Sequence, residues 1–199
     1  MHFDARTFLF AHLYIDYFME NGITEELAKL RTLRGADFVK QLKAIAARKE
    51  FHSLVTDPDI FAVGGGNDAD YQSLLLVARK AVEHGYRVYL LPNPHDFRTA
   101  DFILERRNVY KLFDLKNITG KAIVGSRLLE SLGQANRVLL NMPSDYNTRL
   151  LAADIKNYFN SNTDVLEVMV FRGKKMFSID KTMARSTSFY RILKNYYEQ

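Results

Sequence analysis

The stretch TADFILERRNVYKLFDLK, residues 99–116, decides the fold of this chain. Apolar and polar residues alternate on both sides of a central Arg107–Asn108 pair, which is the pattern of two strands joined by a tight turn. If the turn is centred between those two residues, Asp101 lies directly across from Asp114, with Cβ atoms roughly 5 Å apart. Lys116 follows Asp114 on the same face of its strand. The predicted hairpin therefore places two carboxylates and an ammonium group together.

Two carboxylates this close repel each other unless a cation lies between them. A hard divalent cation such as Mg²⁺ prefers carboxylate oxygens, so Asp101 and Asp114 are candidate metal ligands. A bound cation would polarise a phosphoryl oxygen and lower the pKa of a water, and Lys116 would orient that water and stabilise the developing negative charge. The competing interpretation is structural, with Lys116 simply paired to Asp114 on a solvated sheet face. Both interpretations fit the spacing.

The composition bounds the remaining possibilities. The 199 residues, 47% of them hydrophobic, suit one domain with an appendage or two small domains. The absence of cysteine excludes disulfides, zinc–thiolate sites and cysteine nucleophiles. No apolar run reaches the roughly 18 residues of a membrane-spanning helix, and the aromatic N-terminus lacks the features of a signal peptide. We therefore expect no membrane partner and a cytoplasmic site of action, which the chain could reach through delivery by a larger system.

The net charge of +5 is unevenly distributed along the chain. Residues 1–66 hold 8 Lys and Arg against 9 Asp and Glu, whereas residues 67–199 hold 20 against 14. The excess positive charge thus accompanies the hairpin and favours a polyanionic partner such as RNA or DNA. An ordinary basic domain would show the same balance.

Helical periodicity dominates the first 50 residues. Thr24 is a candidate N-cap for one helix, and the stripe Phe38, Leu42, Ile45 indicates another. The glycine run at 64–66 then predicts a boundary. We expect a small helical N-terminal region over residues 1–66 and an α/β domain over residues 67–199.

Beyond the glycine run, helical and strand patterns alternate. The predicted order is α-β-β-β-α-β-α-β-β, which indicates an α/β fold with a mixed central sheet flanked by helices. The predicted elements cover residues 69–84, 86–91, the 101–116 hairpin, 125–132, 137–142, 148–159, 165–171 and 174–179, followed by a basic, aromatic terminal helix.

Several short motifs follow one another along the sequence around the hairpin. A helix ends in a G-Y-x-V-x-x-L-P strand at residues 85–92, Ala100 and Asp101 open the hairpin, residues 114–116 form a D-x-K triplet, and Gln134–Ala135 opens a later strand. This order resembles nucleases of the PD-(D/E)xK superfamily, which have a restriction-endonuclease-like fold. Within it, residues 68–180 are most similar to the C-terminal tRNase domains of contact-dependent inhibition toxins, the CdiA C-terminal type.

The resemblance implies a metal-dependent endonuclease that acts on RNA, with tRNA as the expected substrate, in a toxin-like role. It implies Asp101, Asp114 and Lys116 as the catalytic group, a divalent ion such as Mg²⁺ as cofactor, and an immunity or assembly protein as a possible partner. Two features depart from the family pattern. Ala100 stands where the superfamily name has proline, and the helix before the first strand lacks its usual glutamate.

Further residues are candidates for metal or substrate binding. Asp70, or Gln72, near the start of that helix could replace the missing glutamate as a third metal ligand. Arg98 and Thr99 precede the first acidic strand and could contact phosphate. The other substrate-binding candidates are His95, Asn117, Ser126 and Gln134. Gln134 could bond to Lys116 or to substrate. Plain structural roles compete: a solvated loop for His95, a helix cap for Ser126, and a bond into the preceding helix end for Gln134.

Two other functions stay open at this stage. A catalytically silent module that binds nucleic acid or protein would keep the same fold and basic face, and the missing helix glutamate favours it. A metal-independent RNase would instead use His95 and Arg98.

Overall fold

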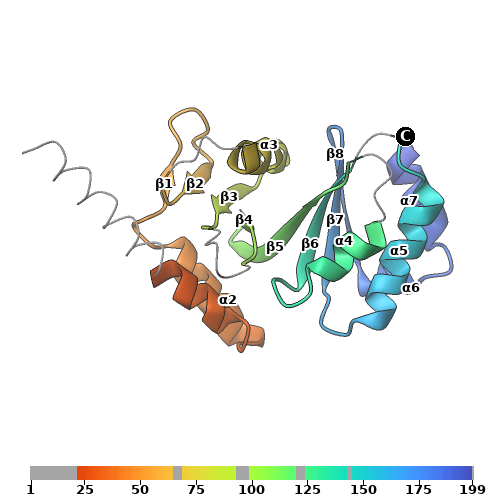
Figure 1. Ribbon diagram of the computed structural model, residues 1–199, viewed down its shortest axis with the longest axis horizontal. Coiled ribbons are helices and arrows are strands. Elements are labelled where there is room, and N and C mark those ends of the chain that lie inside the picture. The colour runs from red at the N-terminus through yellow and green to blue at the C-terminus, as the bar shows by residue number, and fades with distance from the viewer. Residues whose placement is uncertain (1–21, 65–68, 93–98, 120–123, 143–144, 199) are drawn as a thin grey trace, which may run out of the picture.

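The computed structural model describes residues 22–64, 69–92, 99–119, 124–142 and 145–198. Its centre is an eight-stranded sheet whose strands lie side by side in chain order (Figure 1). The strands are β1 (His52–Ser53), β2 (Ile60–Ala62), β3 (Arg87–Leu90), β4 (Phe102–Arg106), β5 (Val109–Asn117), β6 (Arg137–Met142), β7 (Glu167–Arg172) and β8 (Lys175–Asp180). The helices are one over residues 22–30, α2 (Gly35–Ala46), α3 (Ala69–Glu83), α4 (Val124–Glu130), α5 (Thr148–Ser161), α6 (Lys181–Arg185) and α7 (Phe189–Glu198).

The sheet is mixed, as the sequence predicts. The pairs β2–β3, β5–β6 and β6–β7 are parallel, and the other neighbouring pairs are antiparallel. The order α3, β3, β4, β5, α4, β6, α5, β7, β8 repeats the predicted order without a gap. The α/β fold class with a mixed sheet flanked by helices is therefore confirmed.

The β4–β5 hairpin has the predicted register. Arg107 and Asn108 adopt φ angles of 52° and 62°, the left-handed values that a two-residue type I′ turn requires. The backbone N–H of Asn108 donates to Oε1 of Glu105 at 2.6 Å, which holds the turn. Phe102 pairs with Phe113, as the predicted register requires. Asp101 and Asp114 are the next two residues in this register, one position farther from the turn.

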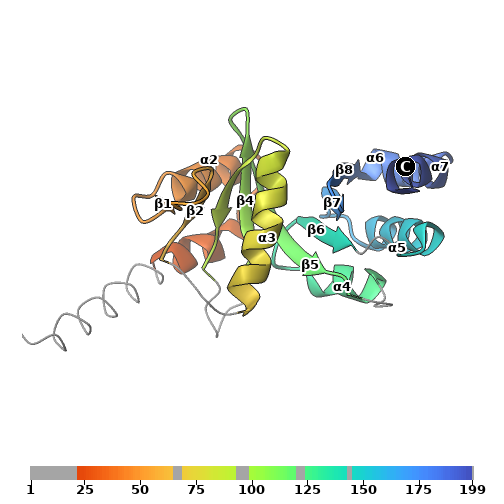
Figure 2. The same cartoon turned by 90° about the horizontal axis from the view of Figure 1, so that it is seen from above.

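The two faces of the sheet carry different helices. α3 covers one face, here called the α3 face, where Phe113 and Leu115 of β5 are buried. The alternation of β5 turns Leu112 and Asp114 to the opposite face, here called the acid face. One end of the acid face is covered by the two N-terminal helices and the other by α4, α5 and α7. Figures 1 and 2 show α2 at one end of the molecule and α5–α7 gathered near β7 and β8 at the other.

β5 joins the two halves of the sheet. Its first part, residues 109–113, pairs with β4, and its last part, residues 114–117, pairs with β6. The change of partner occurs between Phe113 and Asp114. The acid face at this point lies between the two groups of helices.

Residues 52–62 correct the expectation of a purely helical region over residues 1–66. They form β1 and β2, and β2 pairs with β3 through contacts such as Ile60 with Val88. The expected boundary at residue 66 thus falls between two strands of one sheet. Strands of two and three residues are too short to show an alternation in the sequence.

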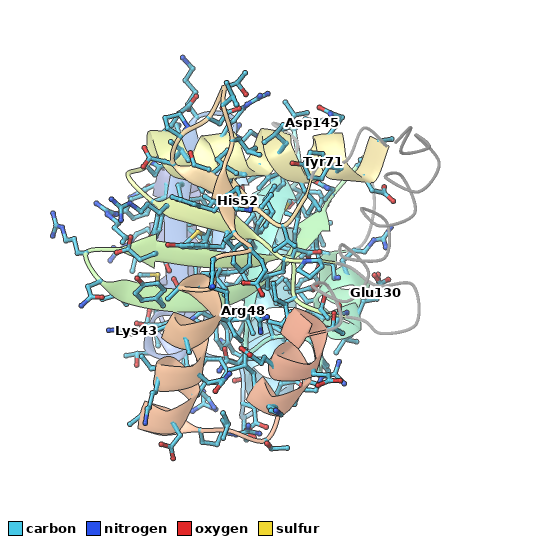
Figure 3. All side chains as sticks on the ribbon, turned by 90° about the vertical axis from the view of Figure 1, so that its left-hand side faces the viewer. Lys43, Arg48, His52, Tyr71, Glu130 and Asp145 are labelled. Atoms are coloured by element: carbon cyan, nitrogen blue, oxygen red, sulfur yellow. The ribbon has the colours of Figure 1, made fainter. Side chains whose placement is uncertain are left out.

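The N-terminal helices pack on the same sheet. Leu42 and Ile45, from the predicted stripe, are buried against Leu112 of β5. Arg48, which follows the end of α2 and is labelled in Figure 3, contacts the first helix, with Nη1 2.6 Å from Oε1 of Glu26. Thr24 lies inside a helix that is already formed at residue 22, so the predicted N-cap is not there.

Candidate functional site

Asp101 lies at the entrance to β4, where backbone hydrogen bonds fix its position. Its N–H donates to the carbonyl of Phe113 at 3.0 Å, and its own carbonyl accepts from the N–H of Leu91 at 3.0 Å. Its side chain reaches across to β5, where Oδ2 accepts from the N–H of Leu115 at 2.6 Å. The carboxyl group is therefore held beside β5 at the point where this strand changes partner.

Asp114 and Lys116 form an ion pair on the acid face. Asp114 is 1% exposed, and Nζ of Lys116 lies 2.7 Å from its Oδ2. Among the described residues, this oxygen accepts no hydrogen bond of normal geometry. The charge of the lysine, rather than a well-directed hydrogen bond, therefore compensates this carboxylate oxygen. The side chain of Lys116 is itself only 14% exposed.

The two carboxyl groups are close enough to shift each other's pKa. Burial, followed by the charge of Asp114, raises the pKa of Asp101 to about 7. Burial also raises the pKa of Asp114, while Lys116 and a hydrogen bond from Asp101 act in the opposite direction. Asp101 is therefore partly protonated at neutral pH, and Asp114 is the carboxyl group that pairs with Lys116. The predicted meeting of all three side chains is present in the structure.

The acid pair suits a cation that needs few protein ligands. Mg²⁺ commonly binds one or two carboxylates and completes its shell with waters and substrate phosphate oxygens. The incompletely satisfied Oδ2 of Asp114 is a suitable ligand for such an ion. In the described ranges, no group of three or more His, Cys, Asp or Glu side chains is arranged to hold a metal. The residues fit a two-carboxylate site, and a cation bound there has to displace the proton of Asp101.

Asp70 is not brought into this group. It lies in the first turn of α3, is exposed, and belongs to the helix that covers the opposite face of the sheet. The third carboxylate expected from the sequence is therefore absent from the acid pair.

Asn117 also lies away from the acid pair, because the alternation of β5 turns it to the α3 face. Its Nδ2 donates to Oγ of Ser73 at 2.9 Å, and its Oδ1 accepts from Nδ2 of Asn141 at 2.8 Å. Lys80 extends this chain by donating to Oδ1 of Asn141 at 2.7 Å. The network fastens α3 to β5 and β6, and it gives Asn117 a structural role where substrate contact was expected.

The other substrate-binding candidates have different outcomes. Thr99 is buried and donates to the carbonyl of Pro92 at 3.0 Å, which fastens the chain just before Asp101. Gln134 donates to the carbonyl of Glu130 at 2.7 Å, so it closes the end of α4 rather than reaching Lys116. Ser126 is exposed on α4. His95 and Arg98 lie outside the described residues.

A buried ionic network that joins β5 to β8 was not predicted. Glu167 of β7 is 6% exposed and accepts from Lys111 at 2.7 Å and from Arg137 at 3.2 Å, and Ser178 also donates to it. Burial lowers the pKa of Arg137, with the charge of Glu167 opposing the shift. Four strands contribute to this group, so sequence spacing contains no signal of it. Its partners are all satisfied, which is typical of a structural ion network.

A cavity lined by arginine and tyrosine was missed as well. It has a volume of about 410 Å³ and lies between the beginning of α5 and α7. Arg149 lies 5.5 Å from the ring of Tyr190, and Arg172 lies 4.4 Å from the ring of Tyr197. The tail tyrosines and Arg149 are about forty positions apart in the sequence, so only the packing of α7 on α5 brings them together.

No protein-family model matches this chain, and no curated protein matches it. A comparison with solved structures finds a chain of the CdiA-CT/CdiI toxin and immunity complex from Burkholderia pseudomallei. The identity is 16% and the TM-score 0.40, over 60% of this chain and 98% of that chain. A likeness of this degree is too low to transfer that protein's activity to this chain.

None of the helices in the described ranges combines the length and apolar character that a bilayer crossing requires.

Proposed function

We propose that this chain is a metal-dependent phosphodiesterase that acts on RNA, with Asp101, Asp114 and Lys116 as the reacting group. One observation supports the proposal above the others. The buried Asp114, the half-buried Asp101 and a lysine 2.7 Å from Asp114 come together on one face at the junction of the two half-sheets. Buried carboxylates that repel each other are costly to the fold, and such costs are common at functional sites.

Each side chain has a distinct part in the proposed reaction. Asp114 supplies Oδ2, which accepts no hydrogen bond among the described residues, whereas Asp101 is oriented by the N–H of Leu115 and supplies a second oxygen when it is deprotonated. A cation bound by these two groups would supply Lewis-acid activation of the phosphoryl oxygen. Lys116, released from its pair with Asp114, then stabilises the negative charge that develops on the phosphate.

The choice of RNA rests on charge and on the sequence resemblance. Residues 67–199 carry the positive excess of the chain, which favours a polyanionic substrate. The preference for tRNA, the toxin-like role and an immunity or assembly partner follow from the resemblance to contact-dependent inhibition tRNase domains.

Cleavage of purified total tRNA tests the proposal. With Mg²⁺ or Mn²⁺ we expect cleavage, and EDTA should abolish it. Lys116→Ala should reduce the rate by about 100-fold or more, because one stabilising contact to the developing anion is lost. Lys156→Ala, an exposed lysine of α5, is the matched control and should cleave normally. Equal rates for the two variants would refute the assignment of Lys116.

A catalytically silent RNA-binding module is the second candidate. The lack of a third carboxylate at the acid pair, within the described residues, favours it, as does the raised pKa of Asp101, because a proton there competes with a cation. Binding of tRNA without cleavage under every metal condition would support this candidate. Cleavage that is indifferent to EDTA would instead support a metal-independent RNase that uses His95 and Arg98.

A further inference from the structure

The cavity between α5 and α7 lies at the same end of the sheet as the acid pair. Strands β5, β6 and β7 are parallel, and Lys116 pairs with Leu140, which pairs with Val170. The next row on this face contains Met142 of β6 and its partner Arg172 of β7. Arg172, which lines the cavity, therefore lies one row beyond Lys116 along the strand direction and two strands across. Two strands correspond to roughly 10 Å.

Both positions also lie on the same face. Leu140, Met142 and Val170 pack with α4, α5 and α7 on the acid face. Side chains alternate along a strand, so Arg172 projects from β7 on the face from which Lys116 projects on β5. Helices α4, α5 and α7 cover this face between the two positions, so an extended polymer strand that contacts both has to follow the edge of the sheet at which β5, β6 and β7 end.

The lining of the cavity combines cations, aromatic rings and carboxylates. Arg149 and Tyr190 form one stacked pair at 5.5 Å, and Arg172 and Tyr197 form another at 4.4 Å. Glu198 also lines the cavity and is held by Oγ1 of Thr148 at 2.9 Å. The remaining lining residues are Asp145, Tyr146 and Asn147.

This mixture suits a nucleotide better than a bare anion. Two arginines facing two carboxylates leave little net charge, so inorganic phosphate alone gains little there. A nucleotide offers a phosphate to arginine, a base to stack on tyrosine, and amino groups that a carboxylate can accept. The volume of about 410 Å³ is within the range of small-ligand cavities.

We propose that the cavity lined by Arg149, Arg172, Tyr190 and Tyr197 binds one nucleotide of a single-stranded RNA segment whose neighbouring phosphates extend toward the acid pair. The placement of the scissile phosphate rests on the proposed function, whereas the binding of a nucleotide in the cavity does not. Arg149 contacts the phosphate at the exposed rim, and the ring of Tyr190 stacks on the base.

Binding of a short fluorescein-labelled single-stranded RNA to the full chain tests the cavity directly, with EDTA present to prevent metal-dependent cleavage. Arg149→Ala and Tyr190→Ala should each weaken binding by about 5-fold or more, the usual effect of losing one stacking or phosphate contact. Arg191→Ala is the matched control, because this exposed arginine lies beside Tyr190 in α7 but does not line the cavity. It should bind within about 2-fold of the wild-type chain. GMP and AMP should compete with the RNA for the wild-type chain, and inorganic phosphate at the same concentration should not.

The outcomes separate this proposal from the proposed function. If both cavity variants bind as tightly as Arg191→Ala, or if inorganic phosphate competes as well as the mononucleotides, the cavity is not a nucleotide site, even in a chain that cleaves tRNA. If the cavity variants lose binding while no metal condition gives cleavage, the nucleotide site stands and the hydrolase proposal fails. Circular dichroism melting of each variant verifies that the loss of binding does not come from unfolding.

Discussion

Asp101 and Asp114 differ in their surroundings, and this decides how each carboxyl group responds to the other. Burial and the charge of Asp114 raise the pKa of Asp101 to about 7, whereas the ammonium of Lys116 opposes the rise in the pKa of Asp114. The carboxyl of Asp101 is also fixed by the N–H of Leu115. A cation that binds here competes with one proton, so its affinity should increase as the pH rises through 7.

The raised pKa of Asp101 makes folding stability depend on pH. The folded state holds the proton more tightly than the unfolded chain, in which an aspartate has a pKa near 3.9. This contribution to stability is complete below about pH 4 and is lost as the pH rises through about 7. Asp101→Asn keeps an acceptor for Leu115 and a donor for Asp114 but has no proton to lose. Without metal at pH 8, we expect it to melt about 3 °C or more above the wild-type chain.

The comparison needs melting curves in EDTA at pH 5 and pH 8. Asp164→Asn is the control, since this aspartate is exposed and should follow the wild-type pH dependence. A lower melting temperature for Asp101→Asn than for the wild-type chain at pH 8 would contradict the raised pKa of Asp101.

At the scale of elements, the sequence predicted long periodic segments well and short or tertiary features poorly. The register of the β4–β5 hairpin could be predicted because the turn residues and the alternation on both strands agree. β1 and β2 could not be predicted, because strands of two and three residues are too short to show a periodic pattern. The sequence also does not show on which side of the sheet α3 packs. Because α3 packs on the face to which Asn117 points, Asn117 bonds to Ser73 and does not line the acid pair.

The same contrast between local and tertiary features holds for the candidate site. Asp101, Asp114 and Lys116 could be predicted because one local hairpin carries all three. The cavity between α5 and α7 could not, because it depends on how the terminal helix docks against the beginning of α5. Gln134 was ambiguous for a related reason: its bond to the end of α4 and a contact with Lys116 were equally compatible with its position in the sequence.

Substitutions in the turn between β4 and β5 should increase the stability of the chain. Arg107 and Asn108 both have positive φ, which arginine adopts at a cost and which an Asn-Gly pair adopts readily. The double substitution Arg107→Asn with Asn108→Gly should therefore stabilise the chain by about 1 kcal/mol. Asn108→Ala should destabilise it, because alanine tolerates this conformation less well. Urea unfolding measures both, and equal stability of the two variants would argue against a type I′ turn.

At the scale of the whole molecule, the acid pair lies where two half-sheets and two groups of helices meet. Among the described strands, β5 is the one that pairs with both halves, with β4 on one side and β6 on the other. The N-terminal helices and β2 complete the half that holds Asp101, because Ile23, Leu42 and Ile45 pack with Ile103 and Leu112. The position of the site therefore depends on residues that the sequence assigned to a separate region.

This arrangement predicts that residues 67–199 do not fold stably alone. That fragment loses β2, which leaves β3 as an unpaired edge, and it exposes Tyr89, Leu91 and Ile103, which the N-terminal helices cover. Uncovered apolar surface and a free strand edge favour aggregation over folding. The control fragment, residues 22–199, keeps these packed residues and should unfold cooperatively in urea. If residues 67–199 unfolded cooperatively at the same urea midpoint as residues 22–199, the N-terminal segment would be a separable appendage. The acid pair would then depend on the hairpin and the C-terminal half alone. The stability of the two fragments in urea therefore shows how much of the chain is needed to position the acid pair.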